Sequence, residues 1–207
     1  SNLKVDESTP QAYVALGRMF GRFLISPGLR YEYTNRRIIS HDLLSMEYNR
    51  HNYSMSSFYP FLTIKYNDDK INAYMQYSRR VDHPDFNILN SGISYVDTLT
   101  YSLGNPDLEA STRNDIRIGL DIGDFSLAML YTHKKRPFEN VEWLAQPTEN
   151  VVYSGWINFT RYEMYTTSLS YGSSWKHLNY YGEIDFNLHR SKLLTSVSNN
   201  FSIDASV

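Results

Sequence analysis

Hydrophobic and polar residues alternate along most of the chain with a period of two. In residues 115–122 (DIRIGLDI), four aliphatic side chains fall on one face, and Asp115, Arg117 and Asp121 fall on the other. This period is typical of a β-strand with one apolar face, because successive side chains point to opposite sides of a sheet. The same alternation occurs in residues 28–34, 61–66, 71–78, 125–133, 152–159, 164–171 and 178–188.

The connections between these segments fall into two length classes. Short turns are predicted at residues 20–22, 67–70, 123–124 and 173–176, and long irregular stretches at residues 35–57, 81–112 and 134–150. We expect three hairpins, formed by residues 61–66 with 71–78, 115–122 with 125–133, and 152–159 with 164–171. The only helix predicted is a turn in HPDFNILN, residues 83–90.

Strand length distinguishes a soluble sheet from a membrane wall. We predict about nine to ten strands of roughly nine to thirteen residues, whereas strands of soluble proteins usually have about five or six. A tilted strand needs about 9–11 residues to cross a bilayer, and outer-membrane barrels alternate short turns with long loops. The predicted fold is therefore all-β, an antiparallel meander of long amphipathic strands that forms part of a transmembrane β-barrel. Without a linker to divide it, residues 1–207 are expected to form one unit.

Composition narrows the class of protein further. The chain contains 18 Tyr, 10 Phe and 3 Trp, residues that favour strands and the interface between water and hydrocarbon. A net charge of −2 provides no basic field for a nucleic-acid partner. The absence of cysteine excludes disulfides and thiolate metal sites. No run of 18 apolar residues occurs, so a transmembrane helix is not expected.

Residues that could carry chemistry are scattered. The six histidines have no metal-binding spacing, and the sequence contains neither a glycine-rich phosphate loop nor a nucleophile elbow. Glu183 and Asp185 share a strand face, but they lie among asparagines and are expected to be a solvated pair. We therefore predict no catalytic residue, cofactor or metal site and no enzymatic activity. A hydrolase site assembled from loop residues is the alternative.

Two short basic clusters stand at the ends of predicted strands. They are Arg79-Arg80 and Lys134-Lys135-Arg136. One interpretation is a charged belt where strands leave the sheet, and the other is a contact with an anionic lipid or ligand.

Three stretches of the sequence resemble the barrel region of TonB-dependent outer-membrane receptors, in the branch related to SusC-type transporters. They are SPGLRYEYTN at residues 26–35, the hairpin with its following loop at residues 58–90, and GNPDLEASTRNDIRIGLDI at residues 104–122. Their order and spacing agree with the family over about half of the chain.

The resemblance implies a location in the outer membrane of a Gram-negative bacterium and uptake of a glycan, a peptide or an iron chelate. It also implies contact with outer-membrane lipid, with TonB and with a surface lipoprotein. Receptors of this family have 22-stranded barrels, so the chain is expected to be a barrel fragment without a plug domain. Six residues are expected at strand–loop junctions, with a role in backbone shape rather than in ligand binding: Arg79, Arg80, Pro84, Gly104, Asn105 and Pro106.

Two other classes of protein fit the same strand pattern. One is a complete small outer-membrane barrel that acts as an adhesin, a pore or a hydrolase. The other is a soluble β-sandwich or ligand-binding barrel, in which the aliphatic faces form an internal core. If the chain is a barrel fragment, its aliphatic faces and open edges are expected to make it self-associate in water.

Overall fold

The structure is a computed structural model that describes residues 2–41, 48–89, 93–96, 99–144, 151–176, 178–192 and 197–206. In this part of the chain, fifteen strands and one short helix follow one another. In chain order they are β1 (Asn2–Ser8), β2 (Gln11–Ala15), β3 (Arg18–Phe20), β4 (Phe23–His41), β5 (Tyr48–Asn67), β6 (Ile71–Asp82), α1 (Phe86–Leu89), β7 (Ile93–Tyr95), β8 (Thr100–Leu103), β9 (Ser111–Ile122), β10 (Phe125–Lys135), β11 (Phe138–Leu144), β12 (Val152–Asn158), β13 (Arg161–Trp175), β14 (Leu178–Lys192) and β15 (Val197–Ser206).

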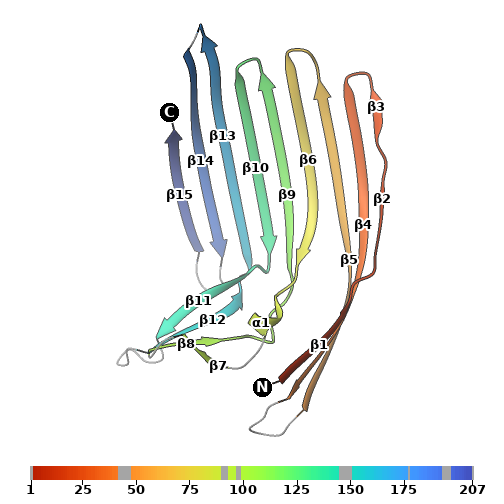
Figure 1. Cartoon of the computed structure of the whole chain (residues 1–207), viewed down its shortest axis with the longest axis vertical. Coiled ribbons are helices and arrows are strands. Elements are labelled where there is room, and N and C mark those ends of the chain that lie inside the picture. The colour runs from red at the N-terminus through yellow and green to blue at the C-terminus, as the bar shows by residue number, and fades with distance from the viewer. Residues whose placement is uncertain are drawn as a thin grey trace.

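Eleven of these strands form one large sheet (Figure 1). Its order is β1-β4-β5-β6-β9-β10-β13-β14-β15, and β2 and β3 also pair with β4. β1, β2 and β3 thus act as one interrupted strand beside β4, so the sheet is nine strands wide. Every pairing in it is antiparallel. The predicted antiparallel meander is therefore confirmed, and the sheet does not close on itself among the described residues.

Prolines explain the interruptions beside β4. Pro10 separates β1 from β2, because a proline has no N–H to donate to the strand ladder. Its carbonyl still accepts a hydrogen bond from the Tyr33 N–H at 3.0 Å. The break between β2 and β3 lies opposite Pro27 of β4, whose carbonyl accepts the Leu16 N–H at 3.0 Å. The main chain therefore stays alongside β4 across both breaks.

Strand register gathers the aliphatic side chains on one face of the large sheet. Across three neighbouring strands, Met75 of β6 lies opposite Ile118 of β9, which lies opposite Met129 of β10. The next row toward the short turns contains Leu120, Leu127, Leu169 and Ile184 in the same way. Since the pairing is continuous, the alternation predicted for single strands becomes an apolar surface across the whole sheet.

The buried positions of the molecule are mostly polar. Among residues with described side chains, the buried apolar ones are Tyr59, Leu108 and two prolines, Pro84 and Pro137. Buried polar residues are more numerous and comprise Thr34, Arg36, Ser57, Ser111, Asp115, Thr132 and Ser154. This distribution is the inverse of that in a soluble domain, which places aliphatic side chains inside.

Three of the four predicted short turns are confirmed. Gly21 and Gly123 adopt φ of 59° and 58°, the left-handed conformation that tight hairpins require and that glycine adopts without strain. The turn predicted at residues 173–176 was misplaced, because β13 continues to Trp175 and the chain turns at Lys176, with φ of 56°.

The predicted irregular stretch at residues 35–57 was wrong. β4 runs to His41 and β5 begins at Tyr48, so these strands have 19 and 20 residues rather than nine to thirteen. Their outer halves pair polar residues, such as Asn35 with Ser54 and Arg37 with Asn52. Backbone hydrogen bonds continue in these outer halves although the hydrophobic alternation has ended. The sequence pattern shows where the apolar face ends but not where the strand pairing ends.

The predicted hairpin of residues 152–159 with 164–171 was also wrong. β12 belongs to a second sheet with order β11-β12-β8-β7, where it pairs antiparallel with β11 and parallel with β8. β13 instead pairs with β10 and β14. Residues 134–150 were likewise expected to be irregular, but they contain the end of β10 and all of β11.

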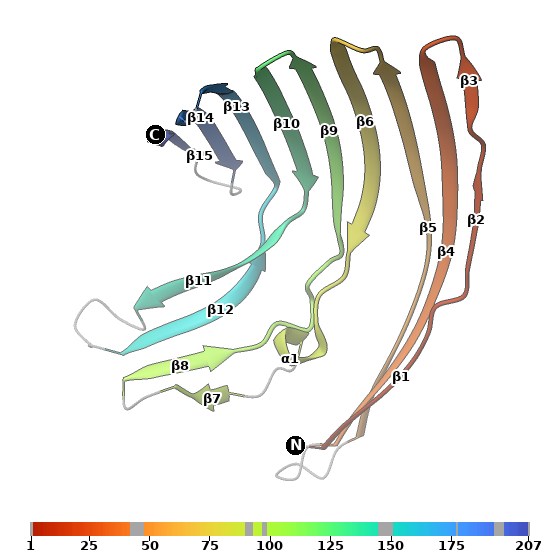
Figure 2. The ribbon, with the colours of Figure 1, turned by 45° about the horizontal axis from the view of Figure 1, so that its top comes forward.

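The second sheet and α1 lie at one end of the large sheet, opposite the short turns (Figures 1 and 2). The predicted helical turn in residues 83–90 is confirmed as α1. No helix in the described ranges is long and apolar enough to cross a membrane. Figure 2 shows the large sheet curved along an arc, with the second sheet crossing below the ends of β9, β10 and β13.

Candidate functional site

The polar face of the large sheet has Asp115 of β9 as its most buried charged residue, with 1% of its surface exposed. Its Oδ1 accepts hydrogen bonds from Thr132 Oγ1 at 2.7 Å and from Arg113 Nε at 2.9 Å. Its Oδ2 accepts a third from Arg80 Nη2 at 2.9 Å. The cluster joins β6, β9 and β10, and its charge-assisted hydrogen bonds offset the cost of burying the carboxylate.

A pocket of about 360 Å³ opens beside this cluster on the polar face. Lys134 of β10, Tyr162 of β13 and Ser191 of β14 line it from adjacent strands at one register level. The Lys134 Nζ lies 5.4 Å from the centre of the Tyr162 ring. Loop-side residues complete the lining: Pro137, Glu139 and Phe159. A cation, an acid and an aromatic ring around one hollow are suited to a polar ligand with a flat ring or an anionic group.

The helix α1 packs against the polar face near β4. Arg36 of β4 donates a hydrogen bond from Nε to Glu7 Oε2 at 2.7 Å, and its guanidinium lies 4.5 Å from the centre of the Phe86 ring. Arg36 is buried by these contacts. The connection between β6 and β9 therefore folds back over the polar side of the sheet, where it narrows the space in front of that face.

His83, just before α1, is a partly buried histidine whose Nε2 has no hydrogen-bond partner among the described residues. Burial lowers the pKa of His83, and the positive charge of Arg36 lowers it further. Three acids oppose this effect more weakly: Glu32, Glu7 and Asp82. His83 is therefore held neutral at the base of the α1 connection.

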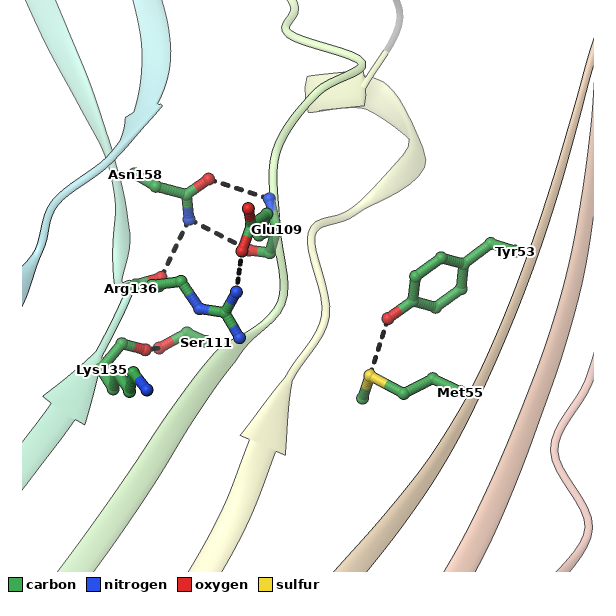
Figure 3. A network of polar contacts seen from close by, with 7 residues as sticks. All are labelled: Tyr53, Met55, Glu109, Ser111, Lys135, Arg136 and Asn158. Atoms are coloured by element: carbon green, nitrogen blue, oxygen red, sulfur yellow. Dashed lines mark hydrogen bonds and ion pairs between the residues drawn. The ribbon is translucent and has the colours of Figure 1, made fainter.

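A second polar network fixes the chain where it leaves the large sheet for the second sheet (Figure 3). Asn158 Nδ2 donates to the carbonyls of Glu109 and Arg136, at 3.0 and 2.9 Å, and its Oδ1 accepts the Glu109 N–H at 2.9 Å. Arg136 forms an ion pair with the Glu109 side chain, and Ser111 Oγ donates to the Lys135 carbonyl at 3.3 Å. The connections from β8 to β9, β10 to β11 and β12 to β13 are thereby tied together.

The two predicted junction arginines, Arg79 and Arg80, lie near the end of β6 on opposite faces. Arg80 points to the polar face and binds Asp115. Arg79 stands on the aliphatic side, beyond the apolar rows, and is exposed. The basic cluster of residues 134–136 divides in the same way: Lys134 lines the pocket, Lys135 is exposed on the aliphatic side and Arg136 pairs with Glu109.

The other predicted junction residues lie in the connection between β6 and β9. Pro84 is buried beside α1. Gly104 follows β8, and Asn105 Oδ1 accepts the Asp107 N–H at 2.9 Å while its Nδ2 donates to the Trp156 carbonyl at 2.9 Å. Pro106 is exposed in this turn. Asn105 thus connects the turn to β12, an arrangement that shapes the loop.

The structure also reveals residues that were not among the predicted site residues. Asp115 was placed on a polar strand face, but its burial and its three partners depend on strands distant in sequence. Glu109 and Asn158 carry no sequence signal, because their partners are distant in sequence. The Asn158 side chain binds main-chain atoms of Glu109 and Arg136, which are 49 and 22 residues away, and the Glu109 side chain pairs with that of Arg136. In the described part of the chain, no group of three acidic or histidine side chains could hold a metal ion.

Comparison with known proteins places this geometry in context. A family model described as "Outer membrane protein beta-barrel family" matches residues 1–207. No curated protein matches the sequence. Among solved structures, the chain is similar to the siderophore receptor PirA from Pseudomonas aeruginosa, with a TM-score of 0.54 and 10% sequence identity. The similarity covers 98% of this chain and 49% of that receptor, so the chain spans about half its length. At this identity the similarity describes the fold alone.

Proposed function

The chain belongs to the outer membrane protein β-barrel family and lies in the outer membrane, and from this premise we propose that it forms part of the barrel of a TonB-dependent transporter. The transporter takes up a large or scarce nutrient: an iron chelate, a glycan or a peptide. Its chemistry is binding and gated passage without a covalent step. TonB is the proposed energy-coupling partner, and membership of the SusC-type branch, with a surface lipoprotein, is part of the same proposal.

The observation that carries this proposal is the layer that folds over the polar face. A wide barrel must narrow its lumen to select a ligand. Here α1 packs on Arg36, and the pocket around Lys134 and Tyr162 lies between the polar face and the start of β11. The long connections thus form a pocket of ligand size at one end of the large sheet. Such a pocket is expected of a selective transporter rather than of an open pore.

Two rival functions fit the structure less well. A complete small barrel pairs its first strand with its last, whereas in the described residues β1 to β3 and β15 lie at opposite edges of the sheet. A soluble sandwich would cover the aliphatic face with a second layer. That face remains open here, with Phe58 and Phe125 each 55% exposed.

Uptake measurements in the native bacterium test the proposal. We expect deletion of this gene and deletion of the TonB gene to abolish growth on the same nutrient, when strains are compared on panels of iron chelates, oligosaccharides and peptides. Reintroducing the gene should restore growth. Uptake that depends on this gene but continues without TonB would contradict the proposal and favour a passive pore.

Site variants sharpen the same experiment. Lys134→Ala removes the cation of the pocket and is expected to reduce uptake of the nutrient at low concentration. Lys70→Ala, in the exposed turn before β6, is the matched control and should leave uptake unchanged. Immunoblots of outer-membrane fractions must show equal amounts of both variants, so that a difference in uptake reports binding and not assembly.

A further inference from the structure

The aliphatic face of the large sheet ends in a row of aromatic residues on the side of the long connections. Tyr77 of β6, Tyr131 of β10 and Tyr165 of β13 stand at one register level, joined through Ile116 of β9. The rings of Tyr131 and Tyr165 are 4.7 Å apart. Tyrosines at the edge of an apolar band mark the level where hydrocarbon gives way to lipid headgroups.

Exposed cations stand directly beyond this aromatic row, on the same face. One level further along the strands are Arg79 and Arg190, and two levels further are Lys135, Arg161 and Lys192. All five side chains belong to exposed residues. We call these five residues the basic belt. Two residues of strand correspond to about 7 Å, so the belt begins at headgroup depth.

The belt has five cations and, within the described ranges, one acid among them, Glu163, which lies directly opposite Arg190. Lys135 of β10 lies directly opposite Arg161 of β13, which lies directly opposite Lys192 of β14. Like charges at directly opposed positions destabilise a sheet unless an anion neutralises them. Within the described ranges the acid on this part of the face is Glu163, whose Oε2 lies 3.7 Å from Arg161 and whose Oε1 accepts a hydrogen bond from the Tyr131 hydroxyl.

The opposite end of the sheet has no such excess. Its described short turns contain the cations Arg22, Lys70 and Lys176 together with three acids, Asp68, Asp69 and Asp124. Arg22 is paired with Asp68. The asymmetry therefore belongs to the end that carries the long connections, which faces the outside in outer-membrane barrels.

We propose that the basic belt binds the phosphate groups of an anionic glycolipid in the outer leaflet of the membrane. The belt has the depth, the charge and the spacing for this ligand: three cations on adjacent strands span about 10 Å, the scale of a headgroup with two phosphates. Arginine forms bidentate hydrogen bonds with phosphate, and lysine adds point charge. The proposal rests on the location in the outer membrane and not on the nutrient transported.

Lipid binding by a charge variant tests the proposal. The protein, folded in neutral detergent, is titrated with lipid A carrying both phosphates and with dephosphorylated lipid A, and bound lipid is counted by native mass spectrometry. We expect the phosphorylated lipid to bind at least about tenfold more tightly, and Lys135→Gln/Lys192→Gln to remove most of that difference. Lys65→Gln/Lys70→Gln removes two exposed lysines at the other end and should bind like the parent protein.

Three outcomes would overturn the proposal: equal affinity for the two lipids, unchanged binding by the belt variant, or an equal loss in the control. Both variants must first show the heat-modifiable mobility of a folded barrel on gels. If the belt variant fails this check, the parent protein in raised salt replaces it. Selective loss of the phosphorylated lipid then supports the proposal, because exposed charge contacts are screened by salt, and retention contradicts it.

Discussion

At Asp115, three hydrogen bonds converge on a carboxylate that is almost completely enclosed by the sheet. We expect Asp115→Asn to lower the free energy of unfolding by about 2 kcal/mol, because Arg113 and Arg80 lose their charged acceptor. Urea unfolding in detergent micelles, followed by tryptophan fluorescence, measures this change. The control is Asp121→Asn, on the same strand and the same face but exposed, for which we expect a change below about 0.5 kcal/mol. Equal losses in both variants would show that the buried cluster has no special role.

His83 connects pH to the packing of α1. Its folded pKa lies below the usual value of about 6.5, so the neutral form is the one that the packed connection favours. The stabilising contribution is therefore complete above about pH 6.5 and is lost as pH falls through the depressed folded pKa. Amide hydrogen exchange of Phe86–Leu89, corrected for intrinsic rates, should accelerate over this range. The rings of His83 and Tyr53 lie edge to face with their centres 6.5 Å apart. His83→Phe keeps a ring in this place and cannot be protonated, so the acceleration should disappear. A variant with the parent profile would rule out His83 as its source.

For single residues, the sequence predicted the face of the strand but not the contact partners. Alternation assigned Asp115, Arg117 and Asp121 to a polar strand face, and the structure confirms that assignment. It could not single out Asp115, because the partners Arg80 and Thr132 lie on other strands and their register is set by pairing. The sequence also did not show that Lys134, Lys135 and Arg136 have three different surroundings. Lys134 and Lys135 are consecutive in β10, so their side chains point to opposite faces of the sheet. Arg136 lies just beyond the end of β10, and its partner Glu109 could not be predicted.

Among the secondary-structure elements, those with a hydrophobic alternation were predictable and those without it were not. The core segments of β4, β5, β6, β9, β10, β13 and β14 all appeared in the sequence as alternating runs. The outer halves of β4 and β5 did not, since they pair polar residues beyond the apolar band. β12 has the alternation of a wall strand and yet pairs in the second sheet. A period of two predicts a strand, but it does not predict which other strand it pairs with. That pairing is determined by the lengths of the connections and by contacts between distant segments.

Within the sheet, Gly119 of β9 makes room for an aromatic ring from the neighbouring strand. Tyr74 of β6 lies directly opposite it, and a Cβ added at Gly119 would meet the ring at 2.1 Å. We expect Gly119→Ala to displace Tyr74 and to cost about 1 kcal/mol of stability, because aromatic packing over a strand glycine is lost.

A double-mutant cycle tests this pairing. In the Tyr74→Ala background, Gly119→Ala should cost less by at least about 0.5 kcal/mol, because there is no ring left to displace. The free energies come from urea unfolding of the four proteins. Additive costs would mean that the glycine matters for backbone conformation alone. Gly182 is the control, since nothing lies within 4 Å of an added Cβ there, and Gly182→Ala should show no coupling to Tyr74→Ala.

The whole molecule exposes more surface than a water-soluble domain of its size. Its accessible area is 14434 Å², whereas a compact monomer of 24.2 kDa exposes about 10,000 Å². Because the excess includes the aliphatic face and two open sheet edges, we expect the chain to self-associate in aqueous buffer and to disperse in detergent. Light scattering in both conditions measures this. A monodisperse monomer in buffer with the aliphatic face still accessible would contradict the orientation assigned to that face.

The same orientation can be tested with two adjacent residues at one depth in the membrane. Met129 lies midway along the apolar band of β10, and Ala128 points to the polar face opposite Gly119 and Ser168. In lipid bilayers, Met129→Arg should destabilise folding by about 2–4 kcal/mol, since its charge enters hydrocarbon near the midplane. Ala128→Arg places the same charge in the aqueous lumen, where we expect little cost. Reversible unfolding from vesicles gives both values. Because strand, depth and introduced residue are the same, a larger cost at Ala128 than at Met129 would contradict the assignment of the aliphatic face to the lipid.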